Sequence, residues 1–178
     1  TQMRAITCFT GLNKEQIIED TSGAHDKWLK VKDNIKMIDT VDWTVQDIDS
    51  HCEKYKPDII IIDQLDKINI AGSFARTDEK LRAVYTSARE IAKRRNCAVI
   101  AISQASALAH NSDHISFDMM ENSRTGKAAE ADLIIGIGHN QRSSETSDND
   151  ARVLNVSKNK ITGWHGDPVC VIQKYISR

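Results

Sequence analysis

The sequence has few of the residues that mark specialised classes of protein. Its 178 residues include only two prolines and eight glycines, which argues against a turn-rich all-β sandwich. No apolar run approaches the ~20 residues that a membrane-spanning helix needs, so we expect no membrane association. The first residues lack a basic segment followed by an apolar one, so they do not predict a secretory signal.

Cysteine and net charge also give no sign of a specialised class. The four cysteines form no CxxC pair and two lie in apolar runs, which favours buried reduced thiols over a metal site or a disulfide framework. Lys and Arg total 24 against 25 Asp and Glu, for a formal net charge of −1. This balance gives no global sign of nucleic-acid binding, although local basic loops stay compatible with it. With 40% hydrophobic and 28% charged residues, the chain has the size and composition of one globular domain.

Predicted strands and helices alternate along the chain and then give way to a hairpin. Apolar runs at 58–63, 97–103 and 133–138 predict strands, and the isoleucine run of the first suits a parallel strand buried on both faces. A long amphipathic helix is predicted after Thr77. Alternating apolar and polar residues then predict an antiparallel hairpin over 152–176. These elements predict an α/β fold, with a mainly parallel sheet flanked by helices and a C-terminal antiparallel hairpin.

The segments around these strands carry further predictions. Residues 44–55 predict a helix capped by Thr44, with Asp47 at the third helical position. Residues 35–39 predict a short strand. The polar stretch that begins at Gln104 is too long for a mere connector, and loops of this length are usually functional or disordered.

Polar side chains follow two of the apolar strands. Asp63 ends the isoleucine run, so its carboxylate should lie at the carboxyl edge of a parallel sheet, where ligands of open α/β folds bind. An aspartate there is the Walker-B arrangement of nucleotide hydrolases, which holds Mg²⁺ through its water shell. The alternative is an aspartate that caps the next turn. Gln104 follows the next strand and could reach a phosphate or a bound water at the same edge, or could simply face solvent.

Two groups of residues invite a phosphate-binding interpretation. A Gly-Lys pair precedes a predicted helix in SRTGKAA, but the pattern G-x-x-x-x-G-K-[ST] needs a glycine at Glu121 and a hydroxyl at Ala128. We therefore reject a phosphate-cradling role for it, and the 178 residues contain no other such loop. Lys158 and Lys160 share one face of a predicted strand, where they could engage phosphates. A solvated edge strand, on which lysines discourage pairing, is the alternative.

Taken in order, these motifs resemble one family. KPDIIIIDQLDKI, a basic amphipathic helix, CAVIAISQAS, ENSRTGKAAEADLIIGIG and RVLNVSKNKITGWHGDPVCV look like the RecA-like motor domain of DnaB-type hexameric replicative helicases, which include phage members. The similarity covers most of the chain. It implies ATP and Mg²⁺ as cofactors, hydrolysis at the interfaces of identical subunits in a ring, and movement along single-stranded DNA. It also implies a location in the cytoplasm of a bacterium or of a phage-infected host.

The resemblance implies roles for individual residues. Asp63 matches the Walker-B aspartate, and Gln104 matches the residue that senses the γ-phosphate. Lys158 matches a lysine that reaches into the neighbouring subunit's ATP. Lys160 stands where the family has an arginine finger, and it keeps the charge but loses the bidentate fork. Basic residues of three loops correspond to the family's contacts with DNA, namely Lys67, Arg76, Arg124, Lys127 and Arg142.

The same resemblance places the P-loop and the glutamate that activates water before Thr1. We therefore expect residues 1–178 to be a partial RecA-like helicase ATPase domain, its C-terminal part, which by itself binds no nucleotide tightly. Two alternatives stay open. One is a recombinase-like RecA-family ATPase, and the other is a non-catalytic RecA-like module that binds DNA or a partner.

Overall fold

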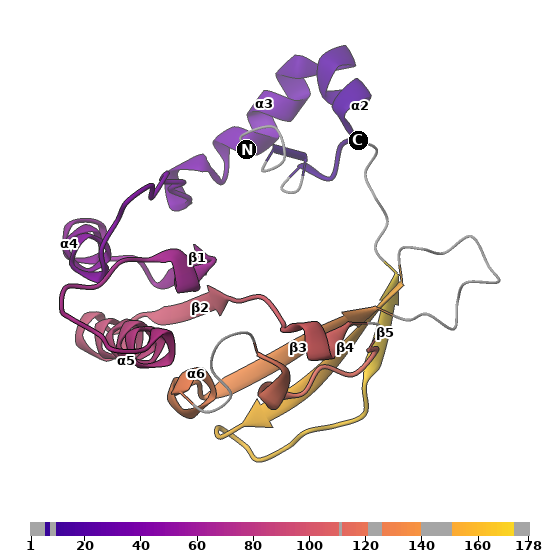
Figure 1. The fold of residues 1–178 in the computed structure, drawn as a ribbon. Helices are drawn as coiled ribbons and strands as arrows, with labels where there is room; N and C mark the ends of the chain where they lie inside the picture. Colours follow the sequence, from indigo (N-terminus) through magenta and orange to yellow (C-terminus); the bar gives the residue numbers. More distant parts are fainter. Residues whose placement is uncertain (1–5, 8–9, 111, 121–125, 140–150, 173–178) are drawn as a thin grey trace. The chain divides into compact units, whose positions relative to one another are not determined.

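The computed structural model describes residues 6–7, 10–110, 112–120, 126–139 and 151–172 (Figure 1). Its contacts divide the chain into two compact units, one that ends at Thr40 and one that spans Val41–Ile172, and each is described by itself. The sequence prediction of one domain over residues 1–178 stays a prediction. Every helix in the described part of the chain is too short or too polar to span a lipid bilayer.

The described part of the first unit is helical. It contains α2 (Lys14–Glu19), α3 (Thr21–Leu29) and a 3₁₀ turn, η1 (Lys32–Asn34). Asn13 and Gln16 form a capping box at the start of α2, which satisfies backbone N–H groups that the helix itself leaves unpaired. The strand predicted at 35–39 is wrong, because a strand needs a hydrogen-bonded neighbour and none of the described residues pairs with this segment.

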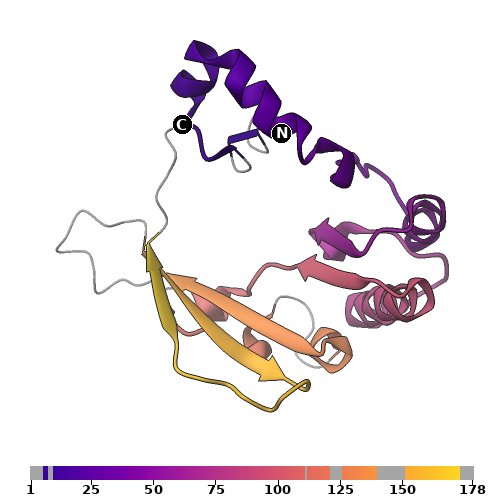
Figure 2. The same ribbon diagram turned by 180° about the vertical axis from the view of Figure 1, so that it is seen from behind.

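The second unit contains a two-stranded parallel sheet with two helices packed on one face (Figures 1 and 2). β1 (Ile59–Asp63) pairs with β2 (Ala98–Ile102), and α5 (Thr77–Arg95) is the crossover helix between them. α4 (Val45–Tyr55) packs beside α5. The elements share one buried apolar core, made of Val45, Ile48, Cys52, Ile62, Leu65, Ile68, Val84, Tyr85, Ala88 and Ile91.

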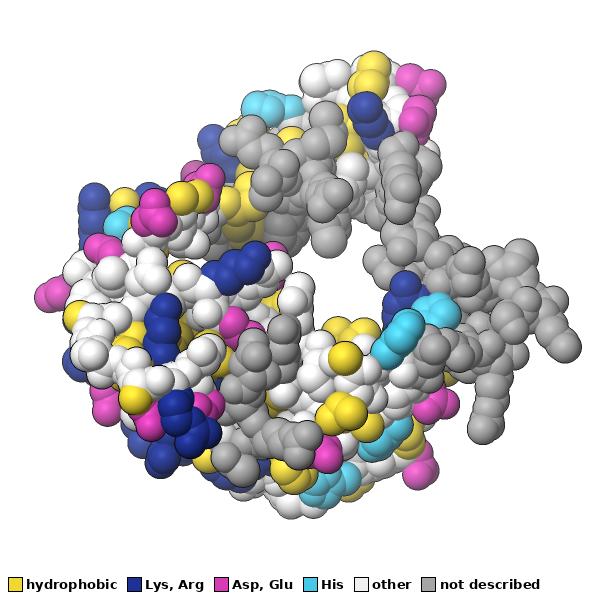
Figure 3. All heavy atoms as spheres, viewed as in Figure 1, with side chains coloured by type: hydrophobic (Ala, Val, Ile, Leu, Met, Phe, Trp, Pro, Cys, Tyr) yellow, Lys and Arg dark blue, Asp and Glu magenta, His cyan; other side chains and the backbone are white. Residues whose placement is uncertain are grey.

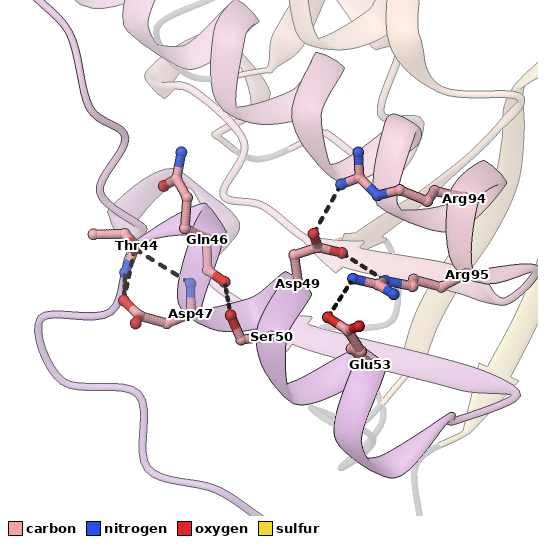
Figure 4. Close-up of polar contacts among 8 residues, drawn as sticks. All are labelled: Thr44, Gln46, Asp47, Asp49, Ser50, Glu53, Arg94 and Arg95. Carbon is pink, nitrogen blue, oxygen red and sulfur yellow. Dashed lines mark hydrogen bonds and ion pairs between the residues drawn. The ribbon is translucent and has the colours of Figure 1, made fainter.

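Local sequence signals explain where α4 begins and ends. The Thr44 hydroxyl accepts a hydrogen bond from the backbone N–H of Asp47, and the Asp47 carboxylate accepts one from the backbone N–H of Thr44 at 2.8 Å (Figure 4). This reciprocal pair is the capping box that the sequence predicts. The helix ends at Lys56, whose left-handed backbone (φ 45°) stops it.

Ion pairs join the outer ends of α4 and α5. The Asp49 carboxylate accepts hydrogen bonds from Arg94 at 3.0 Å and from Arg95 at 2.8 Å, and Arg95 also reaches Glu53 (Figure 4). The hydrogen bond from Arg95 holds the pKa of Asp49 below its ordinary value. These contacts lie where α5 leads into the start of β2, which is the amino edge of the parallel sheet.

β1 is buried on one face only, which corrects the prediction of burial on both faces. Ile60 and Ile62 line the core with α4 and α5, whereas Ile59 and Ile61 leave 58% and 66% of their surface exposed. In β2 only Val99 is half-buried. The physical reason is that α4 and α5 both cover the same face, so in this unit the described residues leave the other face open to solvent.

The remaining strands form a separate antiparallel sheet. β3 (Leu133–His139) pairs with β4 (Ala151–Asn159), and β4 pairs with β5 (Val169–Ile172), which confirms the predicted hairpin. The predicted mainly parallel sheet is wrong for the described strands, because only β1 and β2 pair in parallel. β3 pairs instead with β4, which follows it along the chain, and β4 pairs with β5, so these three strands form a meander of antiparallel neighbours.

Candidate functional site at the carboxyl edge of the parallel sheet

Asp63 and Gln104 lie at the same edge of the parallel sheet. Asp63 is the last residue of β1 and lies opposite Ile102, the last residue of β2, and Gln104 follows two positions later. Both residues are exposed. The carboxyl ends of adjacent parallel strands are where open α/β folds bind ligands. The prediction that the two strands end at the same edge is therefore confirmed, and an exposed carboxylate and an exposed amide follow the two strands there.

A tight turn fixes the chain directly after Asp63. Gln64 has a left-handed backbone, with φ 58° and ψ 59°, which is uncommon for a residue other than glycine. The 3₁₀ turn η2 (Leu65–Lys67) follows, and Leu65 is almost completely buried in the core. Such backbone conformations persist only where the surroundings enforce them, and they gather at functional sites. Asp63 is thus held between a strand on one side and a buried anchor on the other.

Lys158 and Lys160 both bind the short helix α6 (Gly126–Glu130). The Lys158 ammonium donates to the backbone carbonyl of Ala128, and the Lys160 ammonium donates to that of Ala129 at 2.7 Å. Carbonyl groups in the last turn of a helix lack partners within the helix and attract cations. Lys158 lies on β4 (Ala151–Asn159) and Lys160 directly follows the strand, so the predicted shared strand face is wrong, although both side chains reach α6. Burial lowers the pKa of Lys158, and the side-chain contact with Lys160 and the charge of Lys160 lower it further.

The residues predicted to contact DNA lie in different surroundings. Lys67 on η2 and Arg76 at the start of α5 are exposed, and Arg76 also pairs with Asp78 at 2.9 Å. Arg124 and Arg142 lie outside the described residues. On the face drawn in Figure 3, the visible basic side chains are interspersed with acidic and uncharged ones.

Lys127 requires a correction. Its side chain is 0% exposed, and it lies on α6 rather than in a loop, so a direct contact with DNA is wrong for this structure. A fully buried ammonium needs a compensating charge, because removing it from water without one is very costly. Asp66 supplies that charge, at 2.7 Å from the Lys127 Nζ atom.

Lys127 belongs to a polar cluster that the sequence analysis missed. The Asp66 carboxylate accepts hydrogen bonds from the Tyr85 hydroxyl at 2.8 Å, from the Ser103 hydroxyl at 2.9 Å and from Lys127. The Lys127 ammonium also donates to Ser103 at 3.2 Å and lies 5.6 Å from the centre of the Tyr85 ring. Burial raises the pKa of the Tyr85 phenol, so at neutral pH the hydroxyl stays protonated and is the donor of the hydrogen bond to Asp66. We name these four residues the Lys127 cluster.

A signal for this cluster exists in the sequence, although it is weak. Asp66 has the apolar Leu65 before it and Ile68 two positions after it, which is compatible with a side chain beside the core, but the exposed Lys67 has the same apolar flanks. Lys127 is followed by two alanines in a short amphipathic segment, which is compatible with an inward-facing lysine. Neither feature identifies the partner, because the packing of α6 against α5 decides it.

The carboxyl edge of the parallel sheet has one carboxylate suited to a metal ion and one amide suited to a phosphate. Within the described ranges, no three His, Cys, Asp or Glu side chains come together as a metal-binding group. Asp63 alone fits a Mg²⁺ ion that keeps most of its waters and shares the phosphate oxygens of a nucleotide. The exposed Gln104 amide fits a phosphate oxygen or a bound water as hydrogen-bond partner.

Comparisons with known proteins identify the fold. No protein-family model matches the sequence, and no curated protein matches it. Among solved structures, a DnaB-like replicative helicase, described with its interactions with primase, superposes with a TM-score of 0.81 over 97% of this chain at 18% identity. A second solved structure, the ATPase domain of a helicase, superposes with a TM-score of 0.77 over 93% of this chain, also at 18% identity. The fold is that of DnaB-like helicase ATPase domains.

The DnaB-like fold confirms the resemblance found in the sequence, at the level of structure. At 18% identity the superpositions establish the fold alone. The chain spans 46% of the length of the DnaB-like helicase and 63% of the length of the second structure, the ATPase domain. Activity, cofactors and partners are therefore taken up below as proposals.

Within this DnaB-like fold, the long connection after Gln104 is docked on the antiparallel sheet. The buried Asn155 side chain donates to the Ile115 carbonyl at 2.9 Å and accepts from the Ile115 N–H at 3.0 Å. Gly136 of β3 lies so close that a Cβ atom there would be 2.4 Å from the same carbonyl oxygen. The connection therefore runs directly against β3 and β4, and glycine is required at this point of contact.

Proposed function

We propose that this chain is the C-terminal part of an ATP-dependent replicative DNA helicase motor. The observation that carries the proposal is the placement of Asp63 and Gln104 at the carboxyl ends of adjacent parallel strands, within a DnaB-like fold. In this proposal the complete protein hydrolyses ATP with Mg²⁺ where identical subunits of a ring meet. Hydrolysis drives movement along single-stranded DNA.

Each edge residue has a distinct role in the proposal. Asp63 accepts hydrogen bonds from water molecules of a bound Mg²⁺ ion, which supplies charge stabilisation for phosphoryl transfer. The Gln104 amide contacts the γ-phosphate and, through the connection that follows it, links the nucleotide to the DNA-binding loops. Lys158 and Lys160 engage the ATP of the neighbouring subunit. Ammonium groups make stronger hydrogen bonds to phosphate than to a neutral carbonyl, which favours their transfer from α6.

We propose that DNA binds to basic side chains of local loops. Lys67 and Arg76 are the described residues that we propose for this contact, since both are exposed. Arg124 and Arg142 are retained from the resemblance, and Lys127 is withdrawn. Because the chain has a net charge of −1, the attraction of DNA must come from such local groups rather than from the total charge.

Substitution of Asp63 tests this proposal in the full-length gene product. Asp63→Ala should lower the rate of ATP hydrolysis by about 100-fold or more, because it removes the group that holds the metal-bound water. The fold should survive, since Asp63 is exposed. Phosphate release under saturating ATP and Mg²⁺ gives the rate, and circular dichroism checks the fold.

Asp58 provides the matched control. It is exposed and precedes the same strand at the opposite edge of the sheet, so Asp58→Ala should hydrolyse ATP at close to the wild-type rate. Wild-type turnover by Asp63→Ala would contradict the proposed role of the aspartate.

One observation favours a second candidate function. Lys158 and Lys160, which should reach a neighbouring subunit, both bind carbonyl groups of their own chain. That arrangement suits a non-catalytic RecA-like module that binds DNA or a partner. The same assay separates the two candidates, because the module predicts that the wild-type gene product does not hydrolyse ATP.

A further inference from the structure

The buried Lys127 side chain joins the parts of the chain that hold the proposed edge residues. We propose that Lys127 is a positioning residue, which fixes Asp63 and Gln104 relative to each other and to the helix that binds Lys158 and Lys160. This inference rests on the proposed ATPase function. It goes beyond that function because it gives the role to a residue that touches neither nucleotide nor DNA.

The contacts of the Lys127 cluster support this role. Asp66 follows Asp63 by three residues, within the turn that fixes Asp63, and Ser103 directly precedes Gln104. The Lys127 ammonium bonds both of these side chains, at 2.7 Å to Asp66 and 3.2 Å to Ser103. One side chain therefore clamps the two strand ends together at the point where their exposed polar residues lie.

The other end of the connection is α6 itself. Lys127 is followed by Ala128 and Ala129, whose carbonyl groups accept the hydrogen bonds of Lys158 and Lys160. The helix is also tied to α5, because Arg89 contacts Glu130 at 3.9 Å and Asp132, which follows α6, at 3.1 Å. A displacement of the strand ends is thus transmitted through Lys127 to the backbone groups that hold the two lysines.

Stability alone does not account for a buried lysine at this position. Replacing both members of a buried ion pair by neutral groups of similar size is often neutral or stabilising, whereas removing one member leaves a buried charge without a partner. A methionine at position 127 would fill nearly the same volume without the cost of burying charge. The ion pair instead specifies geometry, since it has directional bonds to two strand ends.

Stability and catalysis can be separated with two variants and a control in the full-length gene product. Lys127→Met leaves the Asp66 carboxylate without its cation, so both the unfolding midpoint in urea and kcat for ATP should fall. In the double variant Asp66→Asn, Lys127→Met, the neutral amide can still accept from Tyr85 and donate to Ser103. Its midpoint should return to the wild-type value or above, while kcat stays at least 10-fold low and KM for ATP changes little.

Arg95→Met is the matched control, because it breaks an ion pair with Asp49 at the opposite edge of the sheet. It should lower the midpoint and leave kcat at the wild-type value. Recovery of kcat together with stability in the double variant would overturn the positioning role, even if Lys127→Met alone does not fold. A wild-type protein that does not hydrolyse ATP would instead refute the proposed function, and the positioning role with it.

Discussion

At the scale of single residues, two neighbouring aspartates differ in exposure and in their hydrogen-bond partners. Asp63 is exposed at an edge and free to meet a ligand, whereas Asp66, three residues later, receives three donors within the protein. The two aspartates belong to one short sequence, DQLD. The tight turn that starts at Gln64 separates them, and their side chains lie in different surroundings. A single left-handed residue thus lies between an exposed carboxylate and one that is bonded within the protein.

Asp49 gives a pH-dependent prediction at the same scale. The hydrogen bond from Arg95 lowers its pKa from the ordinary value of 3.8, so the folded state binds the proton less tightly than the unfolded state. Its stabilising contribution is therefore complete above about pH 4 and is lost as the pH falls through the lowered folded pKa. Between pH 5 and pH 2, the wild type should lose unfolding free energy more steeply than Asp49→Asn.

Urea unfolding followed by circular dichroism at a series of pH values measures this difference. Asp58→Asn is the control, since none of the described basic side chains pairs with Asp58. It should keep the wild-type slope. Parallel curves for the wild type and Asp49→Asn would contradict the assignment of this acid sensitivity to Asp49.

At the scale of elements, the docked connection between Gln104 and α6 depends on one amide. Asn155 is buried and satisfies both backbone groups of Ile115. Asn155→Ala should lower the free energy of unfolding by about 1–3 kcal/mol, because it leaves a buried donor and acceptor without partners. It should also speed hydrogen exchange at the Ile115 amide.

Urea titration and hydrogen-exchange mass spectrometry check the two effects. Asn69→Ala is the control, because Asn69 is exposed and its backbone, which the substitution keeps, makes the contacts with Trp43 and Val45. It should leave both properties close to wild type. Unchanged exchange at Ile115 in Asn155→Ala would show that other contacts hold the connection.

Local patterns explain which elements the sequence could predict. The capping box at Thr44 and the apolar spacing of α5 depend on residues within a few positions of one another, and both are confirmed. The isoleucine run of β1 has no alternation, so its pattern could not reveal that one face stays uncovered. The antiparallel pairing of β3 could not be predicted either, because its run LIIGIG also lacks the alternation that is typical of an antiparallel strand.

Part of the candidate site could likewise be predicted from local patterns in the sequence, and part could not. Asp63 and Gln104 follow apolar runs directly, so their place at a sheet edge could be predicted from the sequence. The partners of Lys127 are Asp66, 61 positions away, and Ser103, 24 positions away. The two alanines that follow Lys127 are too weak a signal to distinguish such a buried lysine from a loop lysine that contacts DNA. Its burial follows only from the packing of α6 against α5.

At the scale of the whole molecule, the near-neutral charge bears on how DNA would bind, and the exposed sheet face bears on contacts with other proteins. A net charge of −1 gives the chain no long-range attraction for DNA, so binding by Lys67 and Arg76 would be local and weakened by salt. Ile59 and Ile61 leave apolar surface in the open, and such surfaces often mark contacts with other proteins or chain segments. The exposed apolar face is compatible with the ring of subunits proposed above.

The most direct test of the motor proposal is a structure of the full-length gene product with a non-hydrolysable ATP analogue, Mg²⁺ and single-stranded DNA. The proposal predicts a ring with nucleotide between subunits, a metal-bound water within hydrogen-bond reach of Asp63, and Gln104 facing the γ-phosphate. Lys158 and Lys160 should face the nucleotide of the neighbouring subunit. Nucleotide bound away from the carboxyl edge of β1 and β2, or no nucleotide at saturating concentration, would contradict it.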